Sequence, residues 1–148
     1  MRGPYILRFN TSVSAVQDLF QLLAAANVLT EIQYIKLSAA ATADEQLRLM
    51  GHFGSTDGAG GSTATPQPND QSLPAADTTC EVNNTTQSTD GNIVIDEIWH
   101  TLAPWIWEAA KEQDRIPVAG GDLWQLALED APAAALEISG ELHFYEKG

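Results

Sequence analysis

Hydrophobic and polar residues alternate over several short stretches of the chain, as expected of β-strands that bury one face. The clearest stretch closes the sequence. Its two faces are Leu136, Ile138, Gly140, Leu142 and Phe144 on the inside, and Glu137, Ser139, Glu141, His143 and Tyr145 on the outside. Similar patterns, rich in aromatic and β-branched residues, predict further strands. These are residues 5–10, 30–38, 45–53, 105–107 and 122–128, with another strand starting at Asn92.

One segment has a different period. Val16, Leu19, Phe20 and Leu23 recur at helical spacing. Ser14 with Gln17 three residues later fits a capping box, and Asn27 suits a helix end. The pattern predicts an amphipathic helix over residues 15–26.

The order of these elements indicates the fold class. A strand, a helix and a strand could open a βαβ unit, but after residue 40 the chain continues with strands and irregular segments. We therefore predict a mainly β protein with a single domain over residues 1–148. Its fold would be an antiparallel, jelly-roll-like β-sandwich with one N-terminal amphipathic helix on one face or end. Residues 54–79 are rich in Gly, Ser, Thr and Pro and predict a long arm or loop.

Charge and cysteine content restrict the partners. The formal net charge is −13, and only seven Lys and Arg residues are scattered along the chain, which argues against direct nucleic-acid binding. Most of the excess acid lies in residues 75–148, which suits either a solvated surface or a basic partner. The single cysteine, Cys80, predicts a small buried hydrophobe. The opening residues do not have the pattern of a signal peptide, and no apolar run is as long as a membrane span, so we expect synthesis in a cytoplasm.

Catalytic signatures are missing. His52, His100 and His143 have no metal-ligand spacing, and adjacent acids on a strand point to opposite faces. The sequence therefore predicts no enzyme activity and no catalytic, cofactor or metal residues. The oxygen-rich segment 77–92 leaves a structural cation as an alternative.

Three tryptophans, Trp99, Trp105 and Trp107, fall close together. They could fill the core, form a protein interface, where Trp is enriched, or make a platform for carbohydrate. We treat them as interface candidates, with the core as the stronger interpretation. A β-sandwich carbohydrate-binding module is an alternative function.

Three segments resemble a family of small structural proteins encoded by tailed bacteriophages. They are the opening "PYILRFNTSVSAVQDLFQLLAAANVLTEIQYIKLS", the motif "EVNNTT" at residues 81–86, and the closing "LEISGELHFYE". The resemblance implies a non-enzymatic virion protein, a cement (decoration) protein on the capsid surface. It implies the major capsid protein as partner and a homo-oligomer, a trimer or dimer. A head-tail or tail protein is the alternative within this class.

The motif itself is the second set of interface candidates: Asn83, Asn84, Thr85 and Thr86. Its two overlapping sequons have no role in a protein that is not secreted. We predict a polar strand with Val82 pointing inward, followed by a turn at Asp90-Gly91. Its amides would then face a neighbouring subunit, so that replacing Asn83 and Asn84 with alanine should weaken assembly more than folding.

Overall fold

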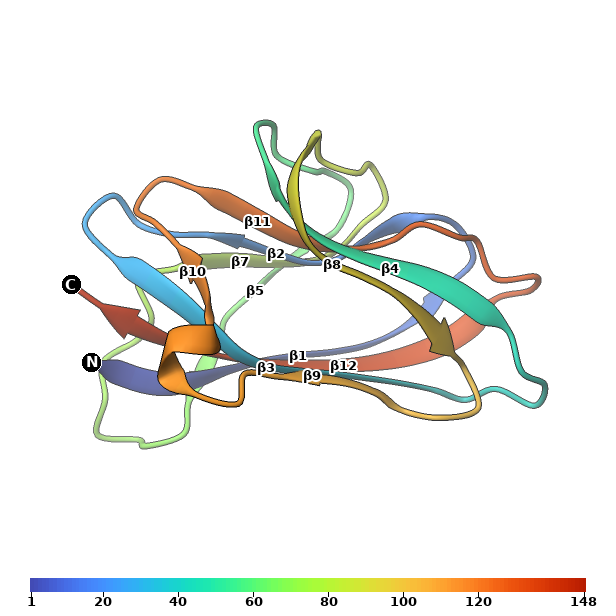
Figure 1. The fold of residues 1–148 in the computed structure, drawn as a ribbon, viewed down its shortest axis with the longest axis horizontal. Coiled ribbons are helices and arrows are strands. Elements are labelled where there is room, and N and C mark those ends of the chain that lie inside the picture. Colours follow the sequence, from blue (N-terminus) through green and yellow to red (C-terminus); the bar gives the residue numbers. More distant parts are fainter.

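Two antiparallel sheets face each other and enclose the hydrophobic core (Figure 1). The computed structural model describes residues 1–148, and almost all of its regular structure is strand. The predicted β-sandwich is therefore confirmed. The one helical turn is a short 3-10 helix, Glu112–Asp114. The structure contains no helix that could span a membrane.

The first sheet is built on three long strands that include both ends of the chain. β1 (Arg2–Val13) and β3 (Leu29–Ala39) pair on either side of β12 (Leu136–Lys147). The short β6 (Gln67–Pro68) extends the sheet beyond β1. Two more short strands, β9 (Trp105–Glu108) and β10 (Ile116–Val118), pair with the other side of β3.

The second sheet has the order β5-β7-β2-β11-β4-β8. Its strands are β5 (Ser62–Ala64), β7 (Thr79–Asn84), β2 (Gln17–Leu23), β11 (Leu123–Leu128), β4 (Gln46–Gly54) and β8 (Asp90–His100). The predicted strands therefore exist, with small shifts at their ends. β8 lies at the end of the order and pairs only with β4.

The alternation predicted for the closing strand is confirmed, because Leu136, Ile138, Leu142 and Phe144 are buried. Gly140 faces the core in the same series, and a Cβ built there would lie 2.2 Å from Cε1 of Phe9. The Phe9 ring packs edge-on against Phe20, with centroids 5.0 Å apart. Glycine at 140 thus leaves room for an aromatic contact that joins the two sheets.

The predicted helix over residues 15–26 is wrong, because this segment contains strand β2. A register shift in the pairing of β2 with β11 leaves Leu19 and its neighbour Phe20 both in the core. Such a bulge breaks the period of two. The polar side chains of Gln17, Asp18 and Gln21 are buried as well. Because both faces of β2 are buried and the strand contains a bulge, its apolar residues do not alternate strictly. Their spacing therefore resembled that of a helix.

Residues 54–79, which were predicted to form an arm or loop, pack against the sandwich of their own chain. β5 pairs with β7 and β6 pairs with β1. Tyr5 donates a hydrogen bond to the carbonyl of Pro74 at 3.0 Å, and Arg2 forms an ion pair with Asp77. Both the first and the second half of this segment therefore contact other parts of the same chain.

Candidate functional site

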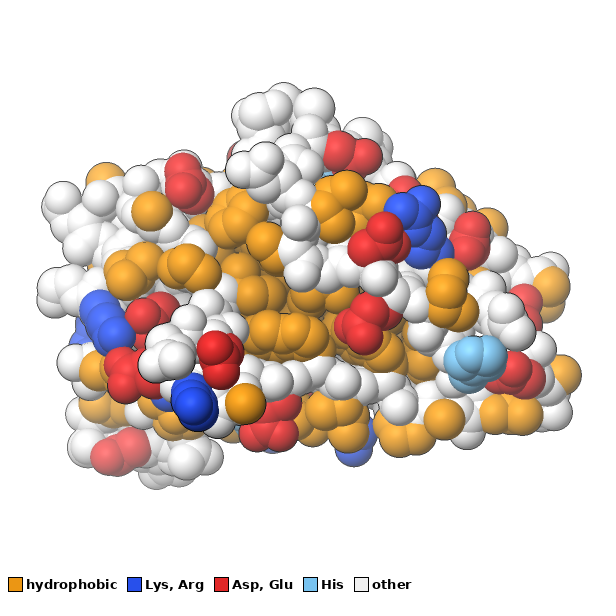
Figure 2. Space-filling model, in the orientation of Figure 1, with side chains coloured by type: hydrophobic (Ala, Val, Ile, Leu, Met, Phe, Trp, Pro, Cys, Tyr) orange, Lys and Arg blue, Asp and Glu red, His pale blue; other side chains and the backbone are white.

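The side of the sandwich that runs between β8 and β9 carries the largest group of exposed hydrophobic residues. Figure 2 shows hydrophobic side chains gathered in a band across this side. We define the apolar edge as Ile93, Val94 and Ile98 of β8, Leu102 of the connecting turn, and Ile106 of β9, which are between 48% and 60% exposed. The free edge of strand β8 has unpaired backbone groups and apolar side chains, so a further strand can pair with it.

The tryptophans beside this edge point inward. Trp99 and Trp105 are buried in the core, and Trp107 is half-buried against it. The indole Nε1 of Trp99 donates a hydrogen bond to the carbonyl of Ala103 at 2.8 Å, which closes the turn between β8 and β9. A carbohydrate platform needs exposed ring faces, and Trp99 and Trp105 do not offer them.

The Asn-Asn-Thr-Thr motif ends strand β7. Val82 is buried, as predicted. Asn83 adopts the left-handed backbone conformation (φ 57°), and its side chain accepts a hydrogen bond from Gln17 at 3.0 Å. Thr85 and Thr86 are exposed. Residues 85–89 connect β7 to β8, which are not neighbours in the second sheet. The turn predicted at Asp90-Gly91 is wrong, because both residues belong to strand β8.

Asn84 is 2% exposed, and all of its polar atoms are used inside the chain. Its Oδ1 accepts a hydrogen bond from the backbone N–H of Gly61 at 3.2 Å. Its Nδ2 donates to Glu81 at 2.9 Å and to Gln21 at 3.3 Å. The side chain therefore anchors the loop after β4 to the outer face of the second sheet, and it is not accessible to a neighbouring subunit.

Asp18 lies in the same buried polar layer, beside Gly58 and Ser88 of the loops that follow β4 and β7. Its Oδ2 accepts a hydrogen bond from the Ser88 N–H at 2.8 Å, whereas its Oδ1 has no partner. Burial raises the pKa of the Asp18 carboxyl to about 6, although Ser88 and His52 favour the charged form. Ionisation of Asp18 is therefore less favourable in the folded chain than in the unfolded chain, and the charged carboxylate destabilises the fold.

Replacing Asp18 with asparagine should raise stability at neutral pH. The pKa of Asp18 is higher in the folded than in the unfolded chain, so its ionisation destabilises the fold as pH rises from about 4 to about 6. The asparagine side chain would keep an acceptor for Ser88 and remove the charge. We expect Asp18→Asn to increase the free energy of unfolding by about 1–2 kcal/mol at pH 8 and by less at pH 4.

Urea denaturation at both pH values measures this effect. Asp57→Asn, at an exposed acid in the covering loop, is the matched control and should change stability by less than about 0.5 kcal/mol. An equal gain from Asp18→Asn at pH 4 and pH 8 would contradict the assignment to ionisation.

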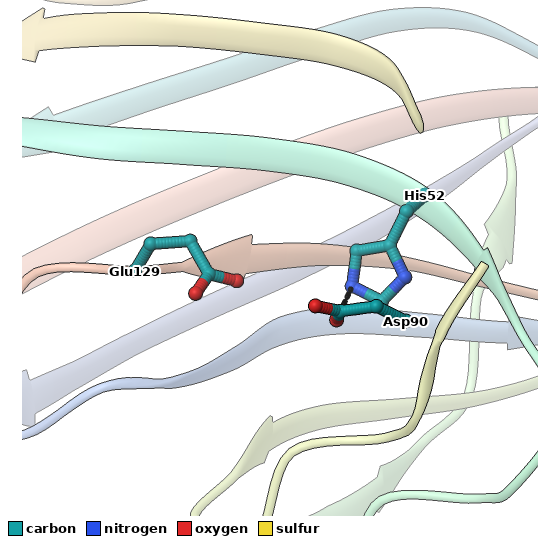
Figure 3. Close-up of side chains that lie close together, drawn as sticks. All are labelled: His52, Asp90 and Glu129. Carbon is teal, nitrogen blue, oxygen red and sulfur yellow. Dashed lines mark ion pairs between the residues drawn. The ribbon is translucent and has the colours of Figure 1, made fainter. Parts of the chain in front are cut away.

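A second polar group lies next to Asp18 and joins three strands (Figure 3). His52 of β4, Asp90 at the start of β8 and Glu129 after β11 have ligand atoms within 4.8 Å of one another. The His52 ring is 1% exposed, whereas the Asp90 side chain is 65% exposed. The sequence indicated no relation between these residues, because they are far apart along the chain.

The remaining polar candidates have ordinary surroundings. His100 pairs with Asp44 at 3.2 Å, and His143 lies 3.4 Å from Glu141. Cys80 is 1% exposed and belongs to the core, as predicted. Burial raises the pKa of its thiol to about 12, so Cys80 is a weak nucleophile.

Comparisons with known proteins add no relative to this description. No protein-family model matches the sequence, and no curated protein or solved structure matches it either. The likeness to phage virion proteins is therefore carried by the three quoted segments alone.

Proposed function

We propose that this protein is a non-enzymatic virion structural protein that binds and stabilises a phage capsid as a cement protein, and that its copies associate through the apolar edge. The observation that carries the proposal is the edge strand β8, which pairs with β4 on one side only and has exposed isoleucine and valine side chains. Contiguous exposed apolar surface is typical of an association site. The proposal that the protein is part of a virion depends on the resemblance of three sequence segments to phage structural proteins.

The order of the strands supports a jelly-roll. When β5, β6, β7 and β10 are left out, the sheets have the orders β1-β12-β3-β9 and β2-β11-β4-β8. Strands that follow one another in the chain then change sheet at every step except from β4 to β8, which are paired neighbours. Double-sheet jelly-rolls of viral capsid and lectin domains are built from two such four-stranded sheets. β5 and β7 extend one sheet as an insertion between β4 and β8. This arrangement suits a stiff surface component of a shell.

We expect a second copy of the chain to bind the apolar edge, because the charges of two β8 strands can be paired favourably. Antiparallel pairing of two β8 strands about Ile95 would place Asp90 of each copy opposite His100 of the other. It would also place Asp96 opposite Val94 and Glu97 opposite Ile93. Pairing about the middle of Asp96 and Glu97 would oppose like charges, which is unfavourable. The pairing therefore predicts a twofold dimer.

The capsid is the second partner, and the acidic surface is the feature that suits it. With a net charge of −13, the chain would complement a basic face of the major capsid protein. We place self-association at the apolar edge, and not in the segment 54–79, because that segment is attached to its own sandwich.

Replacing Ile98 with lysine should weaken self-association. Ile98 is 52% exposed, so the monomer tolerates the change, whereas in the dimer the lysine would replace an apolar contact and lose part of its hydration. We expect the dissociation constant to rise at least about tenfold, equivalent to about 1.4 kcal/mol. Sedimentation equilibrium measures this constant, and circular dichroism verifies the fold.

Val16→Lys is the matched control, because Val16 is 39% exposed and lies outside the apolar edge. The purified protein should also bind expanded capsids that lack it. A monomer without affinity for such shells would overturn the proposal. Labelling of the protein in virions distinguishes the capsid surface from the alternative head-tail and tail positions.

A further inference from the structure

The buried ring of His52 has one nitrogen, Nε2, without a hydrogen-bond partner. Its Nδ1 lies 3.1 Å from the carbonyl oxygen of Phe53. A carbonyl oxygen can only accept, so Nδ1 carries the proton. In the neutral ring, Nε2 then presents a lone pair. That nitrogen is buried, has no hydrogen-bond partner, and is directed toward carboxylates (Figure 3).

The groups around Nε2 are all acceptors. Asp90 Oδ1 lies 3.4 Å from it, and the Glu129 carboxylate completes a group within 4.8 Å. The unpartnered Oδ1 of Asp18 belongs to the same buried layer. Arg48, also on β4, is held by Asp96 through two contacts of 2.8 Å and offers no charge to this group. A lone pair that faces carboxylates is unfavourable, and either a proton on Nε2 or a bound cation between the groups removes the repulsion.

We propose that His52 Nε2, Asp90 and Glu129 bind one divalent transition-metal ion, with zinc as the best match. Ligands of a tetrahedral zinc ion stand about 2.0–2.2 Å from the metal, which places two of them about 3.3 Å apart. The separation of 3.4 Å between Nε2 and Oδ1 agrees with this value. The Glu129 side chain is half-exposed and can close on the ion by rotation.

The ligand chemistry distinguishes zinc from hard cations. Calcium and magnesium take oxygen ligands, whereas an imidazole nitrogen with carboxylates suits zinc and its neighbours among the transition metals. The Phe53 carbonyl that orients the ring corresponds to the outer partner that metal-binding histidines usually have. The second sheet thus provides a nitrogen ligand, two oxygen ligands and the group that orients the ring.

The ion would join the end of β4, the start of β8 and the residue after β11. These three segments are distant in sequence, so the ion would act as a cross-link between them. This inference is independent of the capsid proposal, because it depends only on the geometry within one chain.

Isothermal titration of the tag-free, full-length protein with zinc chloride, after removal of metal with EDTA, tests the site. We expect one zinc ion per chain and a rise in Tm of about 5 °C at a zinc concentration about a hundredfold above Kd. Asp90→Asn and Glu129→Gln should each weaken zinc binding at least about tenfold. Both residues are exposed or half-exposed, so the variants should fold.

Glu97→Gln is the matched control for charge, because Glu97 is an exposed acid on β8 outside the group. It should leave Kd within about twofold of the original value. His100→Gln controls for an exposed histidine on the same strand. Absence of zinc binding, binding that survives Asp90→Asn and Glu129→Gln, or stronger binding of calcium than of zinc would each overturn the assignment.

Discussion

Replacing Trp99 with alanine is expected to lower the free energy of unfolding by about 3–5 kcal/mol, the usual cost of truncating a buried aromatic residue. Trp99 is 1% exposed and belongs to the core cluster. The change would also remove the hydrogen bond from its Nε1 to Ala103. Urea denaturation followed by far-UV circular dichroism measures the loss.

Leu102→Ala provides the comparison at an exposed apolar position in the adjoining turn. Leu102 is 60% exposed, and its replacement should change stability by less than about 0.5 kcal/mol. If Trp99→Ala left the monomer as stable as before but abolished self-association, Trp99 would be an interface residue and its assignment to the core would be wrong.

Replacing Asn84 with alanine should destabilise folding by about 2–3 kcal/mol, because buried groups would lose their partners. The Gly61 N–H would lose its acceptor, while Glu81 and Gln21 would lose a donor. This expectation replaces the one drawn from the motif, in which Asn84 contributed mainly to assembly. Thermal and urea unfolding of the monomer measure the effect.

Thr85→Ala is the matched control within the motif, since Thr85 is exposed and should tolerate the change within about 0.5 kcal/mol. Asn83→Gly should cost less stability than Asn84→Ala, because the relief of the positive φ offsets part of the loss of the hydrogen bond from Gln17. A stable Asn84→Ala monomer that fails to associate would restore the original interpretation.

The strands could be predicted because their alternation is a local property. In β12, each inward residue is followed by an outward one, since successive side chains of a strand point to opposite faces. The same reasoning failed for β2. Its polar residues are buried under loops that come from other parts of the chain, and its bulge interrupts the period of two. Both effects depend on contacts with distant segments.

The candidate sites show the same division. The hydrophobic character of β8 was visible in the sequence, but its position at the end of a sheet depends on the pairing of the other strands. The grouping of His52, Asp90 and Glu129 had no signal in sequence spacing, because the three residues meet only when β4, β8 and β11 lie close together.

The β class, the approximate limits of most strands, the inward faces of β12 and Val82, and the acidic surface could all be predicted from the sequence. These follow from side-chain alternation and composition, which a chain carries before it folds. The strand at residues 17–23, the burial of Trp99 and Asn84, and the position of β8 at the edge of a sheet follow only from the tertiary structure. The physical reason is that burial and strand pairing are set by residues far apart in the chain, which only the packing of two sheets brings together.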